Sequence, residues 1–549
     1  MYSDIRQQLQ DSIAKAVKSA YPDAASLPVV IDTPADTQYG EFSCNIAMQM
    51  AKAVKANPMA IAQKVAAAVS HPLIAKTEVK TPGFINFHLS LPGFYTFLCD
   101  VFMQQAQYGR SKYGQGQKFC LEFVSANPTG PLTVAHGRQA AVGDTLVNIL
   151  KAIGFDAKKE YYVNDEGNQI NILGRSIQAR ALQILGQDEP FPEDGYQGEY
   201  IRDIAKEFMA KNGIKIVADL AKQPAEAFRQ FGVAYLMALI KKDLQDFDVN
   251  FDIWSYQSMI ATNQAIEAVL EDLRVKGFIY ANEGALWFKS THWGDDKDRV
   301  VRKSNGDYTY LTPDIVYHKN KFERGFARVV NILGPDHHGY IPRIKAAAGA
   351  LGKSPDDLDV IIVQLATIFR DGKEVSMSTR RGEFITLREV MDEVGKDAAR
   401  FFFLMRQASA HLEFDLELAK RQSAENPVYY IQYAHARIHS IIRKAKGEAG
   451  VSPKTKDFSR LGAPEEVELL RRIGLYPEIL VGCGKILEPF ALVRFLQELA
   501  SSFHKFYDSL RVLDDDKDIS AERLALIEAV RIVLGNGLRL LGVNAPEKM

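Results

Sequence analysis

Cysteine is scarce in this sequence, and the cysteines that do occur lie far apart. The chain has four of them and no Cys-x-x-Cys pair: Cys44, Cys99, Cys120 and Cys483. This spacing argues against a zinc ribbon and against a disulfide framework. We therefore expect a protein of a reducing cytosol.

Long apolar runs and a strong excess of one charge sign are also missing. No stretch approaches the roughly 18 apolar residues of a membrane span, and the N-terminus lacks the apolar core of a signal peptide. We expect neither secretion nor membrane insertion. The formal net charge is −1. A nucleic-acid partner would therefore need local basic patches, because the chain has no global positive field.

The chain is long enough for several domains. Its 549 residues suggest about three or four units of ordinary size. Residues 1–112 predict an α+β unit with four elements: a helix to Ala20, a strand near 27–31, a helix through 42–54 and a strand within 80–90. The polar, glycine-rich stretch 107–118 predicts a linker.

Residues 113–415 alternate between β-type runs and helical segments, which favours a parallel α/β sheet. The expected strands lie at 118–124, 157–163, 328–334 and 357–366. Between them, 175–275 has helical periodicity and few strand signals, so we expect a mainly helical insertion there, with β character resuming near 284. Residues 416–549 predict an all-helical bundle, interrupted by a loop at Pro453 and an acidic segment at 514–518.

A strand, a proline-rich loop and a helix follow one another at the start of this sheet. Phe119–Val124 predicts the strand, 125–132 the loop, and the helix begins near Val134. Ligands bind beyond the carboxyl ends of parallel strands, where helix N-termini attract phosphate. His136 adds a donor at this helix start. The same pattern also occurs without a ligand, so the residues alone leave both interpretations open.

Two histidine-containing segments raise the question of a metal. Asp336, His337 and His338 follow the run at 328–333, but neighbouring residues on one loop rarely converge on one ion, and no fourth ligand is evident. His435 and His439 have helical i, i+4 spacing, again without further ligands. We expect no metal bound by protein side chains.

Several segments, in order, resemble the class I aminoacyl-tRNA synthetases, and the arginyl enzymes in particular. They are "ANPTGPLTVAH" (126–136), "YYVNDEGNQI" (161–170), "EDGYQGEYI" (193–201), "YTYLTPDI" (308–315), "MSTRRGEFITLREVMDEVGKDAARFFF" (377–403), "NPVYYIQYAHARI" (426–438) and "LRLLGVNAPEKM" (538–549). The likeness extends from near the N-terminus to the last residue. It implies a Rossmann-like catalytic domain between an N-terminal tRNA-contacting domain and a C-terminal anticodon-binding bundle.

The resemblance also implies an activity. Such enzymes join L-arginine and ATP, supplied with Mg²⁺, into arginyl-adenylate, release pyrophosphate, and pass the arginine to the terminal adenosine of tRNA(Arg), releasing AMP. They typically need tRNA before they activate the amino acid. We expect a cytoplasmic monomer with this activity.

Four residues are expected to bind arginine. By the resemblance, Glu122, Tyr310 and Asp314 hold the side chain and Asn127 holds the amino-acid end. This suits the chemistry, because a guanidinium prefers forked carboxylates beside an aromatic face. From the residues alone, Glu122 could instead be an edge-strand charge, and Asp314 a capping residue after Pro313.

The two signature motifs are expected to bind ATP and to catalyse adenylate formation. The resemblance assigns ATP contacts to Ala135, His136, Gly137, Gly334, Asp336, His337, Met377 and Ser378. It assigns catalysis to Thr133, His136, Ser378 and Arg380. Adenylate formation spreads charge over phosphate oxygens, so electrostatic clamping is the main requirement.

Both signatures depart from the family pattern. Thr133 and Ala135 replace the usual histidine and glycine of the first, and Ser376 and Thr379 replace the lysines of the second. Positive charge at the second could come from Arg380, Arg381 or Lys373. The substitutions put the rate in doubt more than the identity.

RNA is expected where aromatic and basic residues interleave. Tyr429, Tyr433 and Arg437 repeat every four residues, and His435, His439 and Arg443 form a second stripe. An amphipathic bundle helix with a solvated basic side would give the same spacing, and the resemblance favours the RNA interpretation. In the N-terminal unit, Lys52, Lys55 and Lys64 are equally compatible with solvated helix charges.

Two other functions compete with the first. Loss of the signature lysines and of one signature histidine fits an RNA-binding paralogue without catalysis. A class I enzyme for another amino acid is the third possibility, and the paired acids Glu122 and Asp314 argue against an apolar substrate.

Overall fold

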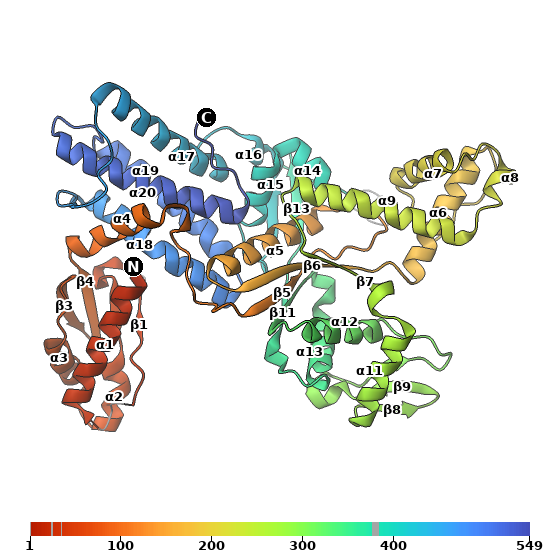
Figure 1. The fold of residues 1–549 in the computed structure, drawn as a ribbon, viewed down its shortest axis with the longest axis horizontal. Coiled ribbons are helices and arrows are strands. Elements are labelled where there is room, and N and C mark those ends of the chain that lie inside the picture. Colours follow the sequence, from red (N-terminus) through yellow and green to blue (C-terminus); the bar gives the residue numbers. More distant parts are fainter. Residues whose placement is uncertain (1, 23–25, 35, 376–383) are drawn as a thin grey trace.

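The computed structural model describes residues 2–22, 26–34, 36–375 and 384–549. Figure 1 shows three parts: an N-terminal domain at one end of the long axis, a C-terminal bundle above this domain, and a central sheet from which a group of helices projects at the other end. No helix among the described residues is long and apolar enough to cross a membrane.

The N-terminal domain packs helices on an antiparallel sheet of order β1-β2-β4-β3. Its elements are α1 (Tyr2–Ala20), β1 (Ile31–Asp32), β2 (Phe42–Cys44), α2 (Ile46–Val54), α3 (Pro58–Ala68), β3 (Ile74–Lys80), β4 (Phe84–Leu89) and α4 (Leu91–Gln104). The helix to Ala20 and the strand within 80–90 are confirmed. The helix predicted through 42–54 was wrong at its start, because Phe42–Cys44 pairs with β4 as a strand. The strand near 27–31 begins only at Ile31.

The predicted linker is irregular but firmly packed. Its Tyr108 is buried and donates a hydrogen bond of 3.0 Å to the Ile473 carbonyl of α18 (Pro464–Ile486). Gly109 has φ 95°, and a Cβ there would lie 2.4 Å from the Tyr476 ring. This segment therefore fixes the C-terminal bundle against the start of the central sheet.

The central sheet has five parallel strands in the order β12-β11-β5-β6-β7. They are β5 (Lys118–Glu122), β6 (Asp156–Val163), β7 (Ile253–Tyr256), β11 (Arg328–Leu333) and β12 (Leu358–Ile362). Each of the four predicted strands is present. Helix α5 (Val134–Ala152) connects β5 to β6, and its residues are buried on nearly every side.

The segment expected to be a helical insertion holds α6 (Asn168–Ile184), α7 (Glu199–Lys211), α8 (Val217–Leu220), α9 (Ala225–Asp246), α10 (Gln257–Ile260) and α11 (Asn263–Val275). Helices α6–α9 project from the sheet (Figure 1). Strand β7 also lies in this range and returns to the edge of the sheet. Only four residues long, it carries too little periodicity to be recognised in the sequence.

Two small three-stranded sheets flank the central one. One contains β8 (Ile279–Asn282), β9 (Ala285–Phe288) and β10 (Arg299–Arg302) and confirms the β character near 284. The other contains β13 (Ala366–Arg370), β14 (Lys373–Glu374) and β15 (Leu412–Asp415). The helices around them are α12 (Leu311–Glu323), α13 (Ile341–Ala350), α14 (Leu387–Val394), α15 (Lys396–Phe403) and α16 (Leu416–Lys420).

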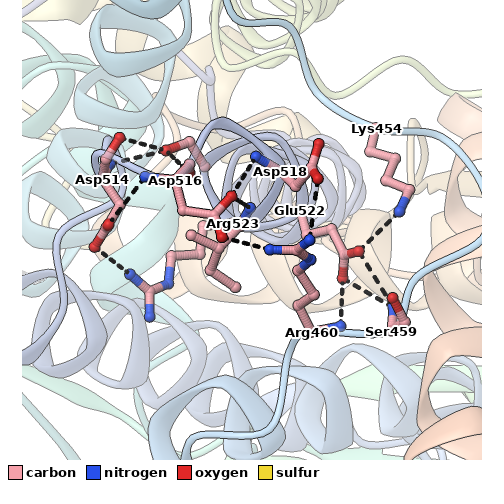
Figure 2. Close-up of polar contacts among 10 residues, drawn as sticks. Lys454, Ser459, Arg460, Asp514, Asp516, Asp518, Glu522 and Arg523 are labelled. Carbon is pink, nitrogen blue, oxygen red and sulfur yellow. Dashed lines mark hydrogen bonds and ion pairs between the residues drawn. The ribbon is translucent and has the colours of Figure 1, made fainter.

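The C-terminal part is helical, as predicted: α17 (Pro427–Lys444), α18, α19 (Phe490–Ser509) and α20 (Lys517–Leu541). Figure 2 shows how the loop before α18 is held on the start of α20. The fully buried Glu522 carboxylate accepts hydrogen bonds from Lys454 Nζ (2.8 Å) and from the backbone N–H groups of Ser459 and Arg460. The acidic segment supplies Asp516, which caps α20.

Candidate active site and RNA-binding face

The order of the central sheet reverses between β5 and β11, and we refer to the region beyond the carboxyl ends of these two strands as the β5/β11 crevice. The chain runs from β5 outward through β6 and β7, and later returns on the other side of β5 as β11 and β12. Such a reversal of strand order is where open α/β sheets bind ligands. Glu122 ends β5 and lies opposite Asn331 of β11. The interpretation of Glu122 as an edge-strand charge was wrong, because β5 is the central strand.

A buried ion pair occupies the bottom of this crevice. Lys321 on α12 is fully buried and lies 2.5 Å from Glu122 Oε2. Its Nζ also donates to Asn331 Oδ1 at 3.0 Å, and Ser125 Oγ donates to Glu122 Oε1 at 3.0 Å. Burial favours the neutral amine, but Glu122 keeps the pKa of Lys321 above its ordinary value. Both oxygens of Glu122 are therefore oriented by partners.

Asp314 lies beside this pair. Tyr340 donates its hydroxyl hydrogen bond to Asp314 Oδ2. Burial raises the pKa of Asp314 to about 7, the Tyr340 bond opposes this rise, and the negative charge of Glu122 adds to it. Glu122 pairs with Lys321, which lies about two helical turns after Asp314 on the same face of α12. The two carboxylates, 192 residues apart (314 − 122), are therefore held by one helix. Among the described residues, the Asp314 carboxylate accepts from Tyr340 and forms no capping bond to its own helix.

A chain of hydrogen bonds connects the two acids. His318 Nδ1 lies 2.8 Å from the Asp314 carbonyl, and His318 Nε2 lies 2.8 Å from Asn331 Nδ2. Asn331 in turn accepts from Lys321, the partner of Glu122. Burial first, and then the charge of Lys321, lower the pKa of His318 to about 3. The ring is therefore neutral and holds α12 in register with β11.

Aromatic rings form one wall of the site. Tyr162 of β6 stacks on Tyr317 with ring centroids 4.4 Å apart, and Lys321 Nζ lies 4.2 Å from the Tyr317 centroid. Tyr162 donates to Gln257 Oε1 at 2.8 Å. Burial first, and then the negative charges of Asp314 and Glu122, raise the pKa of Tyr162. A planar cation would find rings and carboxylates together here.

The other two predicted arginine ligands lie at the rim. Asn127 follows β5 in the loop and donates to Gln169 Oε1 of α6 at 2.7 Å. The loop begins with Val124 and Ser125 at φ 67° and 38°, a left-handed conformation that a β-branched residue rarely adopts outside constrained sites. Tyr310 is the N-cap residue of α12 and is 72% exposed.

His136 occupies the first turn of α5, as predicted. The backbone N–H of Thr133, the N-cap residue, donates to His136 Nδ1 at 3.1 Å. Burial lowers the pKa of His136 to about 4, against the opposing charge of Asp336. The ring is thus neutral at pH 7, and with Nδ1 accepting, Nε2 carries the proton and can donate to a ligand.

Ala135 and Gly137, the two neighbours of His136 in the sequence, have different surroundings. Ala135 is partly exposed at the helix start. Gly137 faces the opposite way, because a Cβ there would lie 2.7 Å from Leu387 and 3.1 Å from Phe403. Close packing of α5 on α14 and α15 is therefore reason enough for glycine at 137.

The loop after β11 faces the start of α5. Gly334 comes directly before a short 3₁₀ helix, Pro335–Tyr340. Asp336 and His337 are exposed, with His337 Nε2 3.7 Å from Asp336 Oδ2. A Cβ on Gly334 would lie 3.7 Å from Gln139 Nε2, so the loop after β11 approaches α5, the helix that begins at the first signature.

The second signature lies outside the described residues, with Ser376, Met377, Ser378, Thr379, Arg380 and Arg381. The structure does describe residues on either side of the second signature. Lys373 is exposed in β14, and Thr386 forms a β-bridge with Thr133, next to His136. The described residue Thr386 therefore lies beside the first signature.

Helix α17 carries the predicted RNA-binding residues on one face. The rings of Tyr429 and Tyr433 stack with centroids 6.2 Å apart and planes 9° from parallel, and His504 of α19 stacks on Tyr433 at 6.0 Å. The Arg437 guanidinium lies 4.1 Å from the Tyr507 ring centroid and donates to the Tyr433 hydroxyl. Arg443 is exposed further along the helix.

The two histidines of α17 contact the C-terminal part of the chain: His435 contacts the segment after α20, and His439 contacts α20 itself. His435 Nδ1 lies 2.8 Å from the Pro546 carbonyl, and His439 Nε2 lies 3.3 Å from Arg531. In the described part of the chain, no group of three or more metal-ligating side chains could hold an ion.

Sequence reasoning missed several residues of the crevice. They are Tyr162, Tyr317, His318, Lys321, Asn331 and Tyr340. Tyr162 and Tyr317 could have been considered because they are aromatic, and Tyr162 also lies in the segment 161–170 that resembles the arginyl enzymes. Lys321 had none, because a lysine on a helix is normally solvated and only the packing of α12 on β11 buries it.

Three family models match the chain in succession. The arginyl tRNA synthetase N-terminal domain matches residues 7–89, the catalytic domain of class I (R) tRNA synthetases matches 98–437, and the DALR anticodon-binding domain matches 431–549. The order agrees with the three parts of the structure.

Known proteins resemble the chain over its full length. The arginine–tRNA ligase of Geobacter sp. (strain M21) is 45% identical, with 99% of this chain and 100% of the relative aligned. That of Anoxybacillus flavithermus is 46% identical over 99% of both chains. The arginyl-tRNA synthetase of Thermus thermophilus shares the fold, with a TM-score of 0.76 at 20% identity over 99% of this chain and all of that one. The chain therefore belongs to the class I tRNA synthetases, in their arginyl branch.

Proposed function

We propose that this protein is an arginine–tRNA ligase. The observation that carries the proposal is the convergence of Glu122 and Asp314 at the β5/β11 crevice, with the neutral His136 at the start of the helix that follows β5. Carboxylates and stacked tyrosines suit a guanidinium, and a helix N-terminus with a histidine donor suits a phosphate. Both substrates of adenylate formation would meet there.

In this proposal, the arginine side chain lies against Asp314 and Glu122. Asn127 takes the amino-acid end, and Tyr310, now exposed, folds over the substrate. Because Lys321 already neutralises Glu122, the net negative charge for the guanidinium comes from Asp314.

ATP binds with its phosphates at the start of α5. His136 donates to a phosphate oxygen, Thr133 offers its hydroxyl, and Ala135 and Gly137 provide the helix start, while Gly334, Asp336 and His337 contact the nucleoside. Mg²⁺ enters with ATP as part of the substrate. Met377, Ser378 and Arg380 complete the clamp on the leaving pyrophosphate.

tRNA(Arg) binds along the C-terminal bundle. Tyr429 and Tyr433 offer rings for unstacked bases, and Arg437 and Arg443 offer charge for phosphates. We assign residues 1–112 to a tRNA-contacting domain, 113–415 to catalysis with the insertion 175–275, and 416–549 to the anticodon. The protein acts as a monomer in the cytoplasm.

The experiment is attachment of radiolabelled arginine to total tRNA with ATP and Mg²⁺, with the nineteen other amino acids in parallel. Charging of arginine alone supports the proposal. Retained tRNA binding without charging of any amino acid would instead identify a non-catalytic paralogue, and charging of a different amino acid would overturn the arginine assignment. Gel filtration with light scattering tests the monomer.

A further inference from the structure

Arg400 joins three separate parts of the molecule from a fully buried position on α15. Its Nε donates to the Leu541 carbonyl at the end of α20 (2.8 Å), and one terminal nitrogen donates to the Phe247 carbonyl just after α9 (2.9 Å). The other terminal nitrogen lies 2.5 Å from Asp144 Oδ2 on α5. One guanidinium thus links the C-terminal bundle, the insertion and the helix of the first signature.

The surroundings are shaped to this guanidinium. Gly542 follows α20 with φ 69°, and a Cβ there would lie 2.4 Å from three guanidinium atoms of Arg400. The planar group therefore lies directly on the glycine backbone. Burial opposes ionisation of Asp144, but Arg400 and Lys159 hold its pKa below the ordinary value.

Asp144 is placed to influence the catalytic end of α5. It follows His136 by eight residues (144 − 136), which is about two helical turns. One turn further on, Asn148 Nδ2 donates to the Leu540 carbonyl at 3.2 Å. Helix α5 is therefore tied to the end of α20 at two successive turns, and its other end carries His136.

The tail after α20, residues 542–549, contacts α17. Gln432 Nε2 donates to the Asn544 carbonyl (2.9 Å) and to Asp397 Oδ2 of α15 (3.0 Å). His435 contacts the Pro546 carbonyl. Gln432 and His435 flank Tyr433 in the sequence, so the helix that presents the RNA-binding face also holds the tail that leads to Arg400.

We propose that Arg400 is a positioning residue that couples RNA bound on α17 to the setting of α5 and His136 for adenylate formation. The inference rests on the proposed function and extends it, because it names how occupancy of the helical bundle reaches the ATP end. RNA that binds to α17 shifts the tail after α20, and Arg400 transmits that shift to Asp144. Packed, hydrogen-bonded elements of this kind carry coupling worth roughly 5- to 150-fold in an equilibrium.

The test replaces Arg400 by lysine in the full-length protein. Arg400→Lys keeps a positive charge beside Asp144 but loses the fork that reaches Leu541 and Phe247. The matched control is Arg539→Lys, an exposed arginine near the end of α20 that contacts Asn536 within its own helix. tRNA(Arg) affinity is measured by filter binding, and arginine activation by ATP–pyrophosphate exchange at saturating tRNA(Arg).

We expect the Kd for tRNA(Arg) and the KM for arginine to stay within about twofold, while kcat of exchange falls at least about tenfold. A merely structural role would instead reduce the folded fraction and leave the kcat of the remaining active protein, counted by active-site titration, unchanged. That result, or loss of tRNA affinity in proportion to exchange, would overturn the inference.

Two further variants keep the test decisive if Arg400→Lys does not fold. Asn148→Ala removes the second tie between α5 and α20, and Gly542→Ala displaces the guanidinium without changing it. Both should lower kcat of exchange at unchanged Kd, and normal exchange in both would refute the coupling. Wild-type exchange decides the proposed function separately: its absence removes both claims, whereas normal wild-type and variant exchange removes the coupling alone.

Discussion

Lys321 and Glu122 form a buried ion pair 2.5 Å long at the bottom of the β5/β11 crevice. The pair leaves no net charge of its own, so Asp314 is the group whose ionisation decides the charge that a cationic substrate meets. Breaking a buried pair by removing one partner is expensive, because the other charge stays uncompensated. The predictions for the arginine site follow from this arrangement.

Replacing Asp314 by asparagine should raise the KM for arginine by at least roughly 30-fold, which corresponds to about 2 kcal/mol. The KM for ATP should change far less, because His136 and the helix start are unaltered. Asp307→Asn, an exposed aspartate before α12, is the matched control. Equal effects on both substrates in steady-state aminoacylation would contradict the assigned role.

Arginine binding should strengthen as pH rises through about 7, the pKa of Asp314. Below this pH the carboxyl is protonated and offers no counter-charge, so the KM for arginine should fall about tenfold between pH 6 and pH 8. Without substrate the sign is opposite. Because folding raises the pKa of Asp314, its contribution to the free energy of unfolding is fully present below the unfolded-state pKa of about 4. This contribution is lost as pH rises through about 7. Asp314→Asn should abolish the pH dependence of KM.

Lys321→Met should destabilise the protein by about 3–5 kcal/mol, because Glu122 is left buried without its counter-charge. Urea unfolding measures the loss. The double variant Lys321→Met/Glu122→Gln should regain part of it, since the uncompensated charge is gone. Lys319→Met on the same helix, which breaks only a partly exposed 3.8 Å pair with Glu323, should be nearly neutral. A single variant as stable as this control would refute the prediction.

Tyr433→Ala should weaken tRNA binding by about 1–3 kcal/mol, or roughly five- to 150-fold in Kd, if a base stacks on this ring. Tyr433 is 36% exposed on the α17 face. Tyr113→Ala, which removes a 48% exposed ring from the linker, is the control. Filter binding at fixed salt distinguishes them, and equal Kd values for the two variants would remove α17 from the RNA interface.

Glu522→Gln should lower the Tm at pH 7 by loosening the loop shown in Figure 2. Burial opposes ionisation of Glu522, but Lys454 and the Ser459 and Arg460 amides keep its pKa below the ordinary value. Its contribution is therefore present above the unfolded pKa of about 4.3 and is lost as pH falls through the lower folded pKa. The difference in Tm from wild type should shrink by pH 3. Glu207→Gln, exposed on α7, should show no difference at either pH.

The fold was largely predictable wherever the hydrophobic periodicity extends over enough residues to be recognised. The strands at β5, β6, β11 and β12 and the C-terminal helices are as expected, because each has enough apolar residues in one pattern. Residues 42–44 were misjudged because three residues of strand next to a helix carry no period of their own. Strand β7 was not predicted for the same reason.

The candidate site was only partly predictable. Motif likeness placed Glu122, Asp314 and His136, and the structure brings Glu122 and Asp314 together and places His136 at the facing helix start. Lys321 and Tyr340 had no sequence signal, since each acquires its partner only when α12 and the loop after β11 pack on β5. The second signature lies outside the described residues, so Ser378 and Arg380 stay predictions.

The sequence by itself determined the family and the order of the domains, because both depend on motifs and hydrophobic periodicity along the chain. Tertiary structure alone decided the charge state of Asp314, the burial of Lys321 and the junction at Arg400. The physical reason is that desolvation and pairing depend on neighbours distant in sequence, and only packing determines which neighbours those are.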